Sequence, residues 1–498
     1  MMEYHTSLNE NRTCEGKPLK RDFFSGRKVL VMGLGRFGGG VDTTKFAASA
    51  AAKVIVTDLA PEAQLSDSIK QLEQFPDIEF HLGSHDPADF QQADIVIANP
   101  AVAPDNEFLQ LARRCNKLVT SQIGIFFQLC PAPIIGITGA NGKSTTTALT
   151  AHLLRGKTED RGQKTEDRRQ SVLRPPPSVL RTVWLSGNIG NEPLLTTIDQ
   201  IGPNDLVVLE LSSFQLEQLA EIRKAPNVSL LTNLTPNHLD RYGTFANYCA
   251  AKENIFKFQE LEKDCPAVSI FNAEDEIAAQ WFEKYKKDAG RICVKFSADD
   301  VSQDIRDSLT LPGRANLSNL AAALAVARYF GVDDAQIKSC LPHFKPLPHR
   351  LELVGQVNGV HWYNDSKATT PQSAIAALEA FDQPTIIIAG GYDKHLPFEE
   401  FGQKIAEQAK AAILIGQTGP KIADAIRNAI SKRGTRDEGR GTRIENVESL
   451  DEAVQLANRL AEPGDVVLLS PACASYDMFE NFEHRGREFI RLVQSLSS

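Results

Sequence analysis

The chain has 498 residues, of which 42% are hydrophobic and 23% charged, and its formal net charge is −9 at pH 7. That length predicts about two to four globular domains, and the acidic balance argues against a general nucleic-acid binder. No apolar run approaches the roughly 20 residues that span a membrane, and residues 1–27 lack the apolar core of a signal peptide. We therefore expect a cytoplasmic protein with reduced cysteines and no nucleic-acid or membrane partner. We also expect it to act as a monomer.

The first domain is predicted over residues 25–121, after a loose tail at residues 1–24. Its apolar strands are Lys28–Met32, Lys53–Asp58 and Asp94–Ala98. The first strand runs into the G-x-G-x-x-G sequence Gly33–Gly38, and the second ends in Asp58, which is the pattern of a nucleotide-binding βαβ unit. A glycine turn that binds no ligand is the alternative. This region predicts a Rossmann-like domain.

The central domain is predicted over residues 122–346, and its apolar run Ile134–Thr138 enters a glycine turn. A Lys-Ser pair and a helix-compatible run from Thr145 to Leu154 follow. Such a turn and helix N-terminus bind oxyanions through backbone N–H groups, while Lys143 can neutralise phosphate charge and the Ser144 hydroxyl can ligate Mg²⁺. The first glycine of the usual G-x4-G-K-[ST] spacing falls at Ile137, so a plain glycine turn stays the alternative.

Further strands of the central domain are predicted at Asp205–Glu210, Asn227–Thr232 and Ala267–Phe271, and an Ala-rich helix at Leu317–Phe330. The heptapeptide Lys157–Gln163 is repeated almost unchanged at Lys164–Gln170, and three prolines follow. Sequence this polar cannot bury enough apolar area to order itself. We expect residues from 157 to 180 to be a disordered surface insertion without a catalytic role.

The third domain is predicted over residues 347–498, with strands at Thr385–Ala389, Ala411–Ile415 and Asp465–Leu469. Apolar strands that alternate with helices predict parallel sheets covered on both faces. The predicted fold class is α/β, with three domains. They are a Rossmann-like first domain, a central parallel-sheet domain like that of P-loop ATPases, and a Rossmann-like third domain.

Polar motifs follow the predicted strands, at the edge where open α/β sheets bind ligands. They are Gly187–Gly190, Glu210–Leu216, Asn237–Tyr242, Ala250–Lys252, Pro348–Arg350, Asn364–Thr369 and Ser470–Ser475. Together they resemble the motifs of the Mur ligases of peptidoglycan synthesis, and the resemblance runs from residue 28 to the C-terminus apart from the insertion. The segments Ser212–Leu216 and Ser470–Gly486 favour the family member that adds D-glutamate.

The resemblance implies an ATP-dependent amide ligase with two chemical steps. ATP phosphorylates the carboxylate of UDP-N-acetylmuramoyl-L-alanine, and the amine of D-glutamate then displaces phosphate from the acyl phosphate. The implied cofactors are ATP, Mg²⁺ at two sites, and a CO₂-derived carbamate on Lys252. Both steps develop negative charge, which metal ions and cationic side chains stabilise.

The resemblance also implies which residues take part. The implied catalytic residues are Lys143, Glu210, His238, Lys252 and Lys367, and the implied metal ligands are Ser144, Glu210, His238 and carbamylated Lys252. The implied ATP contacts are Gly139, Ala140, Asn141, Gly142, Lys143, Ser144, Thr145, Asn316, Asn319, Arg350 and Asp365. Ala315 stands where the family often has His before the first of the two asparagines.

The two other substrates have implied sites of their own. Contacts to the UDP-linked substrate are implied for Gly35, Arg36, Phe37, Asp58, Leu59, Asn99 and Asn188. Contacts to D-glutamate are implied for Thr369, Lys394, Ser475 and Phe482. A dicarboxylate needs a cation and hydroxyl or backbone donors, and Lys394 can be that cation. Arg36, Leu59 and Thr370 depart from the residues expected at their positions.

Three alternatives remain at this point. Another ligase of the superfamily would add L-alanine, a diamino acid, a dipeptide or a folate-linked glutamate, although the Asp-Asn-Pro-Arg motif of the diaminopimelate-adding member is absent. A nicotinamide-dependent oxidoreductase would use Gly33–Gly38 and Asp58 but would leave the Lys143 turn unexplained. A nucleotide-binding module without catalysis is the third.

Overall fold

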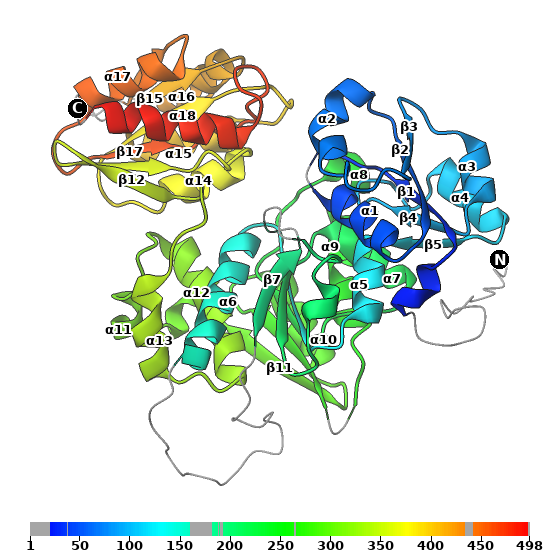
Figure 1. Ribbon diagram of the computed structural model, residues 1–498. Coiled ribbons are helices and arrows are strands. Elements are labelled where there is room, and N and C mark those ends of the chain that lie inside the picture. The colour runs from blue at the N-terminus through cyan, green and yellow to red at the C-terminus, as the bar shows by residue number, and fades with distance from the viewer. Residues whose placement is uncertain are drawn as a thin grey trace, which may run out of the picture. The chain divides into compact units, whose positions relative to one another are not determined.

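The computed structural model describes residues 20–36, 38–159, 182–187, 189, 193–262, 265–433 and 442–496, without the side chains of 157–159, 240 and 433. The chain forms two compact units, each with its own core. The first unit holds the residues up to Ser297 together with Ala321–Ile337, and the second holds Ala298–Leu320 together with the residues from Lys338 onward. Figure 1 shows the three sheets that these units contain.

The first sheet of unit one is parallel throughout, in the order β3-β2-β1-β4-β5. Its strands are β1 Lys28–Met32, β2 Lys53–Asp58, β3 Glu79–Leu82, β4 Ile95–Ala98 and β5 Leu118–Ser121. The helices that connect them are α1 Gly39–Ser49, α2 Glu62–Lys70, α3 Pro87–Gln92, α4 Glu107–Arg114 and, after β5, α5 Gln122–Leu129. Alternate residues of β1 enter different clusters of buried side chains, so both faces of the sheet are covered.

The second sheet of unit one is also parallel throughout, in the order β11-β10-β9-β6-β8-β7. Its strands are β6 Ile134–Thr138, β7 Val183–Gly187, β8 Leu206–Glu210, β9 Val228–Leu231, β10 Ala267–Asn272 and β11 Arg291–Phe296. Its helices are α6 Lys143–Glu159, α7 Ser213–Glu221, α8 Leu239–Tyr242, α9 Phe245–Lys257 and α10 Glu276–Tyr285. Short helices η1 Arg21–Phe24 and η2 Ile198–Gln200 also belong to this unit.

The third sheet forms unit two and is mixed, in the order β12-β13-β17-β14-β15-β16. Its strands are β12 Glu352–Val357, β13 Val360–Asn364, β14 Thr385–Gly390, β15 Ala409–Ile415, β16 Arg443–Asn446 and β17 Val466–Leu469. Its helices are α14 Pro371–Leu378, α15 Glu399–Gln408, α16 Gly419–Arg433, α17 Leu450–Leu460 and α18 Phe482–Ser495. The remaining elements are η3 Ala298–Asp300, α11 Gln303–Arg306, η4 Leu341–His343, and α12 Arg314–Tyr329 and α13 Asp334–Cys340, which cross the boundary between the units.

The predicted α/β class is confirmed, but the expectation of parallel sheets alone is wrong for the third sheet. Strands β12 and β13 pair antiparallel. Asn358 and Gly359, with φ of 52° and 80°, connect them in the left-handed conformation that a two-residue hairpin turn requires. The Asn-Gly pair between two valines was the available sequence signal for this hairpin.

Several predicted boundaries also change. Residues Arg21–Phe24 form a helix and Phe24 is buried, so the loose tail expected through residue 24 ends before Arg21. Helix α6 runs five residues past Leu154 to Glu159, into the start of the expected insertion. Most of that insertion, residues 160–181, lies outside the described residues.

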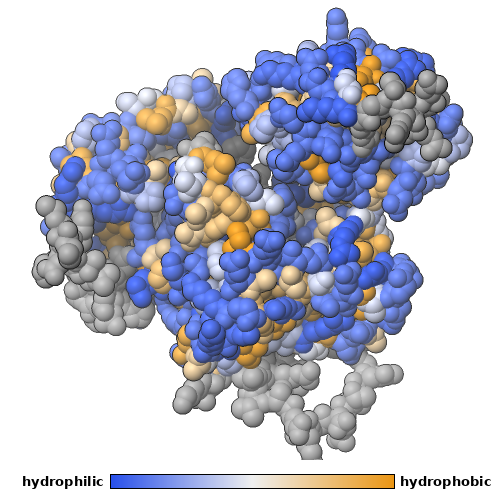
Figure 2. All heavy atoms as spheres, turned by 180° about the vertical axis from the view of Figure 1, so that it is seen from behind, coloured by the Kyte–Doolittle hydropathy of each residue, from blue (hydrophilic) through white to orange (hydrophobic). Residues whose placement is uncertain are grey.

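The surface of the described residues carries hydrophobic side chains in separate areas. Figure 2 shows such areas on one face, set among hydrophilic residues. The large hydrophobic side chains that are exposed are Leu59, Leu239, Leu261, Leu353, Tyr392, Ile430 and Tyr476. Scattered exposure of this kind is ordinary for a folded protein. In the described part of the chain, no helix has the length and hydrophobicity to cross a membrane.

The two sheets of unit one are tied together by the buried carboxylate of Asp42 on α1. Its oxygens accept hydrogen bonds from the backbone N–H groups of Leu194, Leu195 and Thr196 at 3.0, 2.8 and 3.0 Å. The Thr196 hydroxyl and the Gln122 side-chain amide donate to it as well, at 2.6 and 2.7 Å. Five donors replace the water that burial removes, which keeps a buried carboxylate stable without a cation.

Replacing Asp42 should therefore destabilise unit one. Asp42→Ala leaves two buried N–H groups and one partly buried N–H group without this acceptor, and we expect a loss of about 2 kcal/mol or more in unfolding free energy. Urea unfolding monitored by circular dichroism measures the effect. Asp67→Ala on exposed α2 is the matched control, with an expected change within about 0.5 kcal/mol. An unfolding midpoint of Asp42→Ala equal to that of the control would refute this role.

Candidate active site

The turn predicted to bind phosphate, residues 139–145, is held by the loop after β9. Asn233 accepts from the Ala140 N–H through its carbonyl at 2.8 Å and from the Asn141 N–H through its side chain at 2.9 Å. The Thr232 hydroxyl donates to the Asn141 carbonyl at 2.6 Å. The backbone groups of Ala140 and Asn141 are thus used inside the protein. The first N–H groups of α6, which follow, are those that a helix leaves for capping or ligand.

Gly139 makes this arrangement possible. Its φ is 151°, and a Cβ at this position would clash with the Thr232 hydroxyl and lie 3.1 Å from the Asn233 backbone. At the other end of the turn, Gly142 has a φ of 77°. Lys143 begins α6 and its ammonium donates to the Ala140 carbonyl at 2.8 Å, so the side chain folds back over the turn. Ser144 is buried in the first turn of the helix.

Lys252 is a buried amine close to this turn. It is 2% exposed, and its ammonium nitrogen lies 3.1 Å from the Thr138 hydroxyl and 5.0 Å from the Tyr248 ring centroid. Burial lowers its pKa well below the usual value, and the charge of Lys143 lowers it further, against the opposing influence of Glu210. Glu210 ends β8, beside Ile137 of β6, and is 2% exposed. Lys143, Glu210 and Lys252 therefore share one low-dielectric region at the carboxyl edge of the second sheet.

Lys252 is carried by helix α9. Helix α9 begins at Phe245, capped by the Thr244 hydroxyl, so Lys252 lies in its middle with Tyr248 one turn before it. The helical spacing places both side chains on the same face, turned into the protein. The fully buried position, which desolvates the amine, could not be read from the local pattern.

His238 also lies near Tyr248. Its ring centroid is 6.4 Å from that of Tyr248 and 5.0 Å from that of Phe214, and its backbone is left-handed with φ of 52°. The following Arg241 stacks on Phe214 at 4.1 Å and pairs with Glu217 at 3.0 Å. Its guanidinium also donates to the carbonyls of Pro100 and Ala101 in the first sheet domain. The motif Asn237–Tyr242 thus joins the two sheets of unit one.

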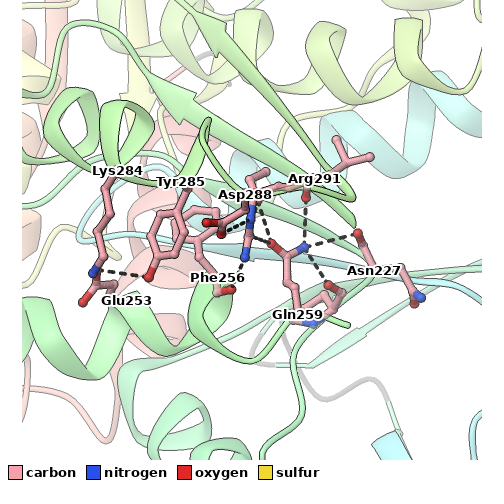
Figure 3. Close-up of polar contacts among 11 residues, drawn as sticks. Asn227, Glu253, Phe256, Gln259, Lys284, Tyr285, Asp288 and Arg291 are labelled. Atoms are coloured by element: carbon pink, nitrogen blue, oxygen red, sulfur yellow. Dashed lines mark hydrogen bonds and ion pairs between the residues drawn. The ribbon is translucent and has the colours of Figure 1, made fainter. Parts of the chain in front are cut away.

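The end of α9 is fixed by a polar cluster that sequence reasoning missed (Figure 3). Arg291 donates to the Phe256 carbonyl at 3.0 Å, to the Gln259 side chain at 2.5 Å and to Asp288 at 3.1 Å. Gln259 in turn donates to the carbonyl of Asn227 before β9. The cluster locks the helix that carries Lys252 against β9, β10 and β11. Its members lie on separate elements, so no local sequence motif predicts the cluster.

At the edge of the first sheet, the glycine turn and the β2 acid contact each other. Asp58 accepts from the backbone N–H of Gly35 at 3.0 Å and of Ala60 at 2.9 Å, one with each carboxylate oxygen. Asn99 lies against Gly33, whose added Cβ would be 2.8 Å from the Asn99 Cβ. Arg36 and Leu59 are exposed there. Phe37 and Asn188 lie outside the described residues.

Unit two gathers a second group of predicted residues around Asp365. This carboxyl is buried, accepts from the Ser470 hydroxyl at 2.9 Å and the Leu351 N–H at 3.2 Å, and burial raises its pKa to about 7. Lys367 follows it, with its ammonium 5.4 Å from the Phe482 ring. His349, which we expected to assist here, packs on the same ring at 6.2 Å.

The other predicted residues of unit two range from buried to exposed. Ser475 is buried after β17, Thr369 is half-buried before α14, and Lys394 is exposed after β14. The backbone at Tyr392 pairs with that at Ala474, so the loop after β14 meets the loop after β17. Asn319 donates to Asn316 at 3.2 Å near the start of α12, and Arg350 is half-buried beside His349.

The residues near the turn include oxygen ligands of the kind that a hard cation such as Mg²⁺ binds. Among the described residues, no group of three or more His, Cys, Asp or Glu side chains could hold a metal ion. Mg²⁺ is held in nucleotide sites by one or two protein oxygens together with phosphate oxygens and water. The buried carboxylate of Glu210 and the buried hydroxyl of Ser144 are oxygens of the kind that this requirement names.

Comparison with known proteins identifies the family. Residues 27–121 match the MurD-like N-terminal domain of Mur ligases, 137–327 the Mur ligase middle domain, and 349–473 the Mur ligase glutamate ligase domain. A UDP-N-acetylmuramoylalanine–D-glutamate ligase of Roseiflexus sp. is 38% identical, with 95% of this chain and 99% of the relative covered. The chain belongs to the Mur ligase family.

Other Mur ligases extend the comparison. The Acetivibrio thermocellus and Clostridioides difficile proteins of the same name are 36% and 35% identical, and each aligns with 95% of this chain, over 97% and 99% of its own length. The solved UDP-N-acetylmuramate-alanine ligase of Thermotoga maritima has a TM-score of 0.55 at 19% identity, covering 94% of this chain and 99% of that one. MurF of Acinetobacter baumannii has a TM-score of 0.54 at 14% identity, covering 95% and 91%. At these identities the solved Mur ligases share the fold.

The close packing of Gly139 gives a direct test of the turn. Gly139→Ala forces a methyl group onto Thr232, and we expect a loss of roughly 1–3 kcal/mol in stability together with weaker ATP binding. Gly202→Ala is the control, because its Cβ would meet nothing nearer than 3.6 Å. Calorimetric ATP titration and thermal unfolding measure both effects. Equal behaviour of the two variants would mean that the turn is not set by this contact.

Proposed function

We propose that this Mur ligase adds D-glutamate to UDP-N-acetylmuramoyl-L-alanine with ATP, in the synthesis of peptidoglycan. The observation that carries the proposal is the full-length identity to ligases of that name. The set Lys143, Glu210 and Lys252 also supports the proposal. These groups suit phosphoryl transfer, which a dinucleotide oxidoreductase does not carry out.

The reaction follows from the poor reactivity of a carboxylate toward an amine. An oxygen of the L-alanyl carboxylate attacks the γ-phosphorus of ATP, and the bond to ADP breaks. The D-glutamate amine then attacks the acyl carbon, phosphate leaves with the bonding electron pair, and the amine proton passes to solvent. Lys143 and the N–H groups at the start of α6 hold the β- and γ-phosphates while charge develops on them. We also propose that the protein acts as a monomer in the cytoplasm.

Mur ligases use ATP and Mg²⁺. We assign the metal-binding oxygens and nitrogen of this chain to Ser144, Glu210, His238 and a carbamate on Lys252, at two sites. Bound Mg²⁺ supplies positive charge that stabilises the transferring phosphoryl group. Asn316, Asn319, Arg350 and Asp365 are assigned to the nucleotide.

The carbamate is supported by the environment of Lys252. Carbamylation needs a neutral amine, whose nitrogen forms a bond to the carbon of CO₂ while one proton leaves. The lowered pKa favours the neutral amine. The product is an anion with two oxygens, the ligand type that Mg²⁺ prefers. It also places a negative charge near the positive charge of Lys143.

We also assign residues to the two remaining substrates. Gly35, Arg36, Phe37, Asp58, Leu59, Asn99 and Asn188 are assigned to the UDP-linked substrate, and Thr369, Lys394, Ser475 and Phe482 to D-glutamate. Lys367 is assigned to the reacting groups. The proposed domains are residues 25–121, 122–346 and 347–498, which carry the UDP-linked substrate, ATP and the amino acid.

The specificity assay tests the function. ADP release is measured with UDP-N-acetylmuramoyl-L-alanine and, in turn, D-glutamate, L-glutamate, L-alanine and meso-diaminopimelate. We expect release only with D-glutamate, and no NAD(P)H binding by fluorescence titration. Release with another amino acid would assign the enzyme to a different ligase of the family.

Lys252→Ala should be nearly inactive, because the second metal loses its anionic ligand. We expect a fall in kcat of roughly a thousandfold, with partial recovery on addition of acetate, which can fill the vacant oxygen position. Lys257→Ala, at the end of the same helix and exposed, is the control. Full activity of Lys252→Ala in CO₂-free buffer would exclude the carbamate.

Lys394→Ala should act on one substrate. Losing the cation that faces a carboxylate should raise the KM for D-glutamate by about tenfold or more, with a much smaller change for ATP. Lys421→Ala is a matched control from the same surface, because Lys421 pairs with the neighbouring Asp393. A rise of equal size for ATP and D-glutamate would place Lys394 at the nucleotide instead.

A further inference from the structure

Arg485 is a buried cation that the assigned chemistry does not use. It lies in the first turn of α18 with 1% of its surface exposed. Burial lowers its pKa to about 10, so it stays charged at neutral pH. A buried charge is costly unless hydrogen bonds and counter-charges compensate it. The partners of this guanidinium therefore show what it is for.

The side chain of Arg485 donates its hydrogen bonds to neutral oxygens. Its Nε donates to the Ser366 hydroxyl at 3.0 Å, and its Nη2 donates to the carbonyls of Ser366 and Cys473 at 2.8 and 3.1 Å. Its Nη1 donates to the Ala474 carbonyl at 3.3 Å. Across the described ranges of the chain, no carboxylate comes within ion-pair distance of it. The charges of Asp477 and Asp365 act on it from farther away and raise its pKa against the effect of burial.

These partners come from the ends of adjacent strands. Ser366 follows β13, and Cys473 and Ala474 follow β17. A third loop, after β14, passes equally close, since a Cβ at Gly391 would lie 3.3 Å from the Arg485 Nη1. The Tyr392 N–H donates to the Ala474 carbonyl at 2.9 Å. One planar guanidinium therefore sets the spacing of three loops at the carboxyl edge of the third sheet.

The same loops carry the residues assigned to the amino acid. Lys367 and Thr369 follow Ser366, Ser475 follows Ala474, and Lys394 follows Gly391. The Ser366 hydroxyl accepts from Arg485 and donates to the Phe482 carbonyl at 2.8 Å. Phe482 is thereby joined to the network at the start of α18.

We propose that Arg485 is a positioning residue of the D-glutamate pocket, which it holds in shape through three loops while its buried positive charge favours a dicarboxylate substrate. The inference rests on the proposed function. Charge without an ionic partner in a low-dielectric interior acts over longer distances than a solvated charge. A guanidinium with fixed fork geometry also fixes its carbonyl partners in a way that a lysine cannot.

A purely structural role makes a different prediction. Loss of folded protein lowers the amount of active enzyme, so it lowers the apparent kcat and leaves KM unchanged. Loss of a positioned, positively charged pocket raises the KM for D-glutamate and leaves that for the UDP-linked substrate as it was. The split between the two KM values therefore separates the two roles.

The experiment compares Arg485→Met and Arg485→Lys with Arg491→Gln, a surface residue of the same helix that pairs with Glu488. We expect Arg485→Met to raise the KM for D-glutamate by about tenfold or more, and Arg485→Lys by less, because lysine keeps the charge and loses the fork. The KM for UDP-N-acetylmuramoyl-L-alanine should stay within about twofold in all three. Arg491→Gln should match wild type.

Ser366→Ala provides a milder variant if Arg485→Met does not fold. It removes one acceptor of the guanidinium and the link to Phe482, and we expect about a fivefold rise in the KM for D-glutamate. Unchanged KM values for D-glutamate in Ser366→Ala and Arg485→Lys, with only kcat lowered, would overturn the proposal. Wild-type enzyme that releases no ADP with D-glutamate would refute the proposed function itself, whatever the variants do.

Discussion

The contact between Gly139 and the loop after β9 is the constraint on which the central site depends. The turn lies directly against Thr232 and Asn233. The backbone groups of Ala140 and Asn141 therefore form hydrogen bonds within the protein. The start of α6 is thereby held at one position above β6. From Gly142 onward, the first N–H groups of α6 have no acceptor within the helix, which is why we propose that they bind phosphate. The shape of the site thus depends on hydrogen bonds to the loop after β9 as much as on the glycines of the turn.

Parallel strand order explains why the reactive groups meet. Strands β6 and β8 are neighbours, so Glu210 ends beside the turn that follows β6. Helix α9 leads into the region before β10, on the far side of β9, and brings Lys252 to the Thr138 hydroxyl from there. Carboxyl ends of parallel strands share one edge, and helices cross back over the faces. Residues more than a hundred positions apart in the chain are thereby assembled without any local signal.

Buried charges mark the places where loops must be held in one arrangement. Asp42 and Arg485 are both surrounded by neutral hydrogen-bond partners, and both join segments from different elements. Lys252 differs, since it has one hydroxyl partner and an aromatic ring, and its lowered pKa favours the neutral form. A charge with many fixed donors or acceptors organises its surroundings. An amine with few of them is poised for chemistry.

The sequence by itself determined the α/β class, the apolar central strands, the turn before α6 and the family, because each is written in contiguous residues. Strands such as β3 and β16 are half-exposed and charged, so their sequences show no apolar run. Only the tertiary structure decided that they join sheet edges and that β12 turns back on β13. It alone also decided that Lys252 is buried, that Asp42 bridges two sheets and that Arg485 links three loops. These properties depend on which elements become neighbours, and neighbours are chosen by the packing of whole faces rather than by any local pattern.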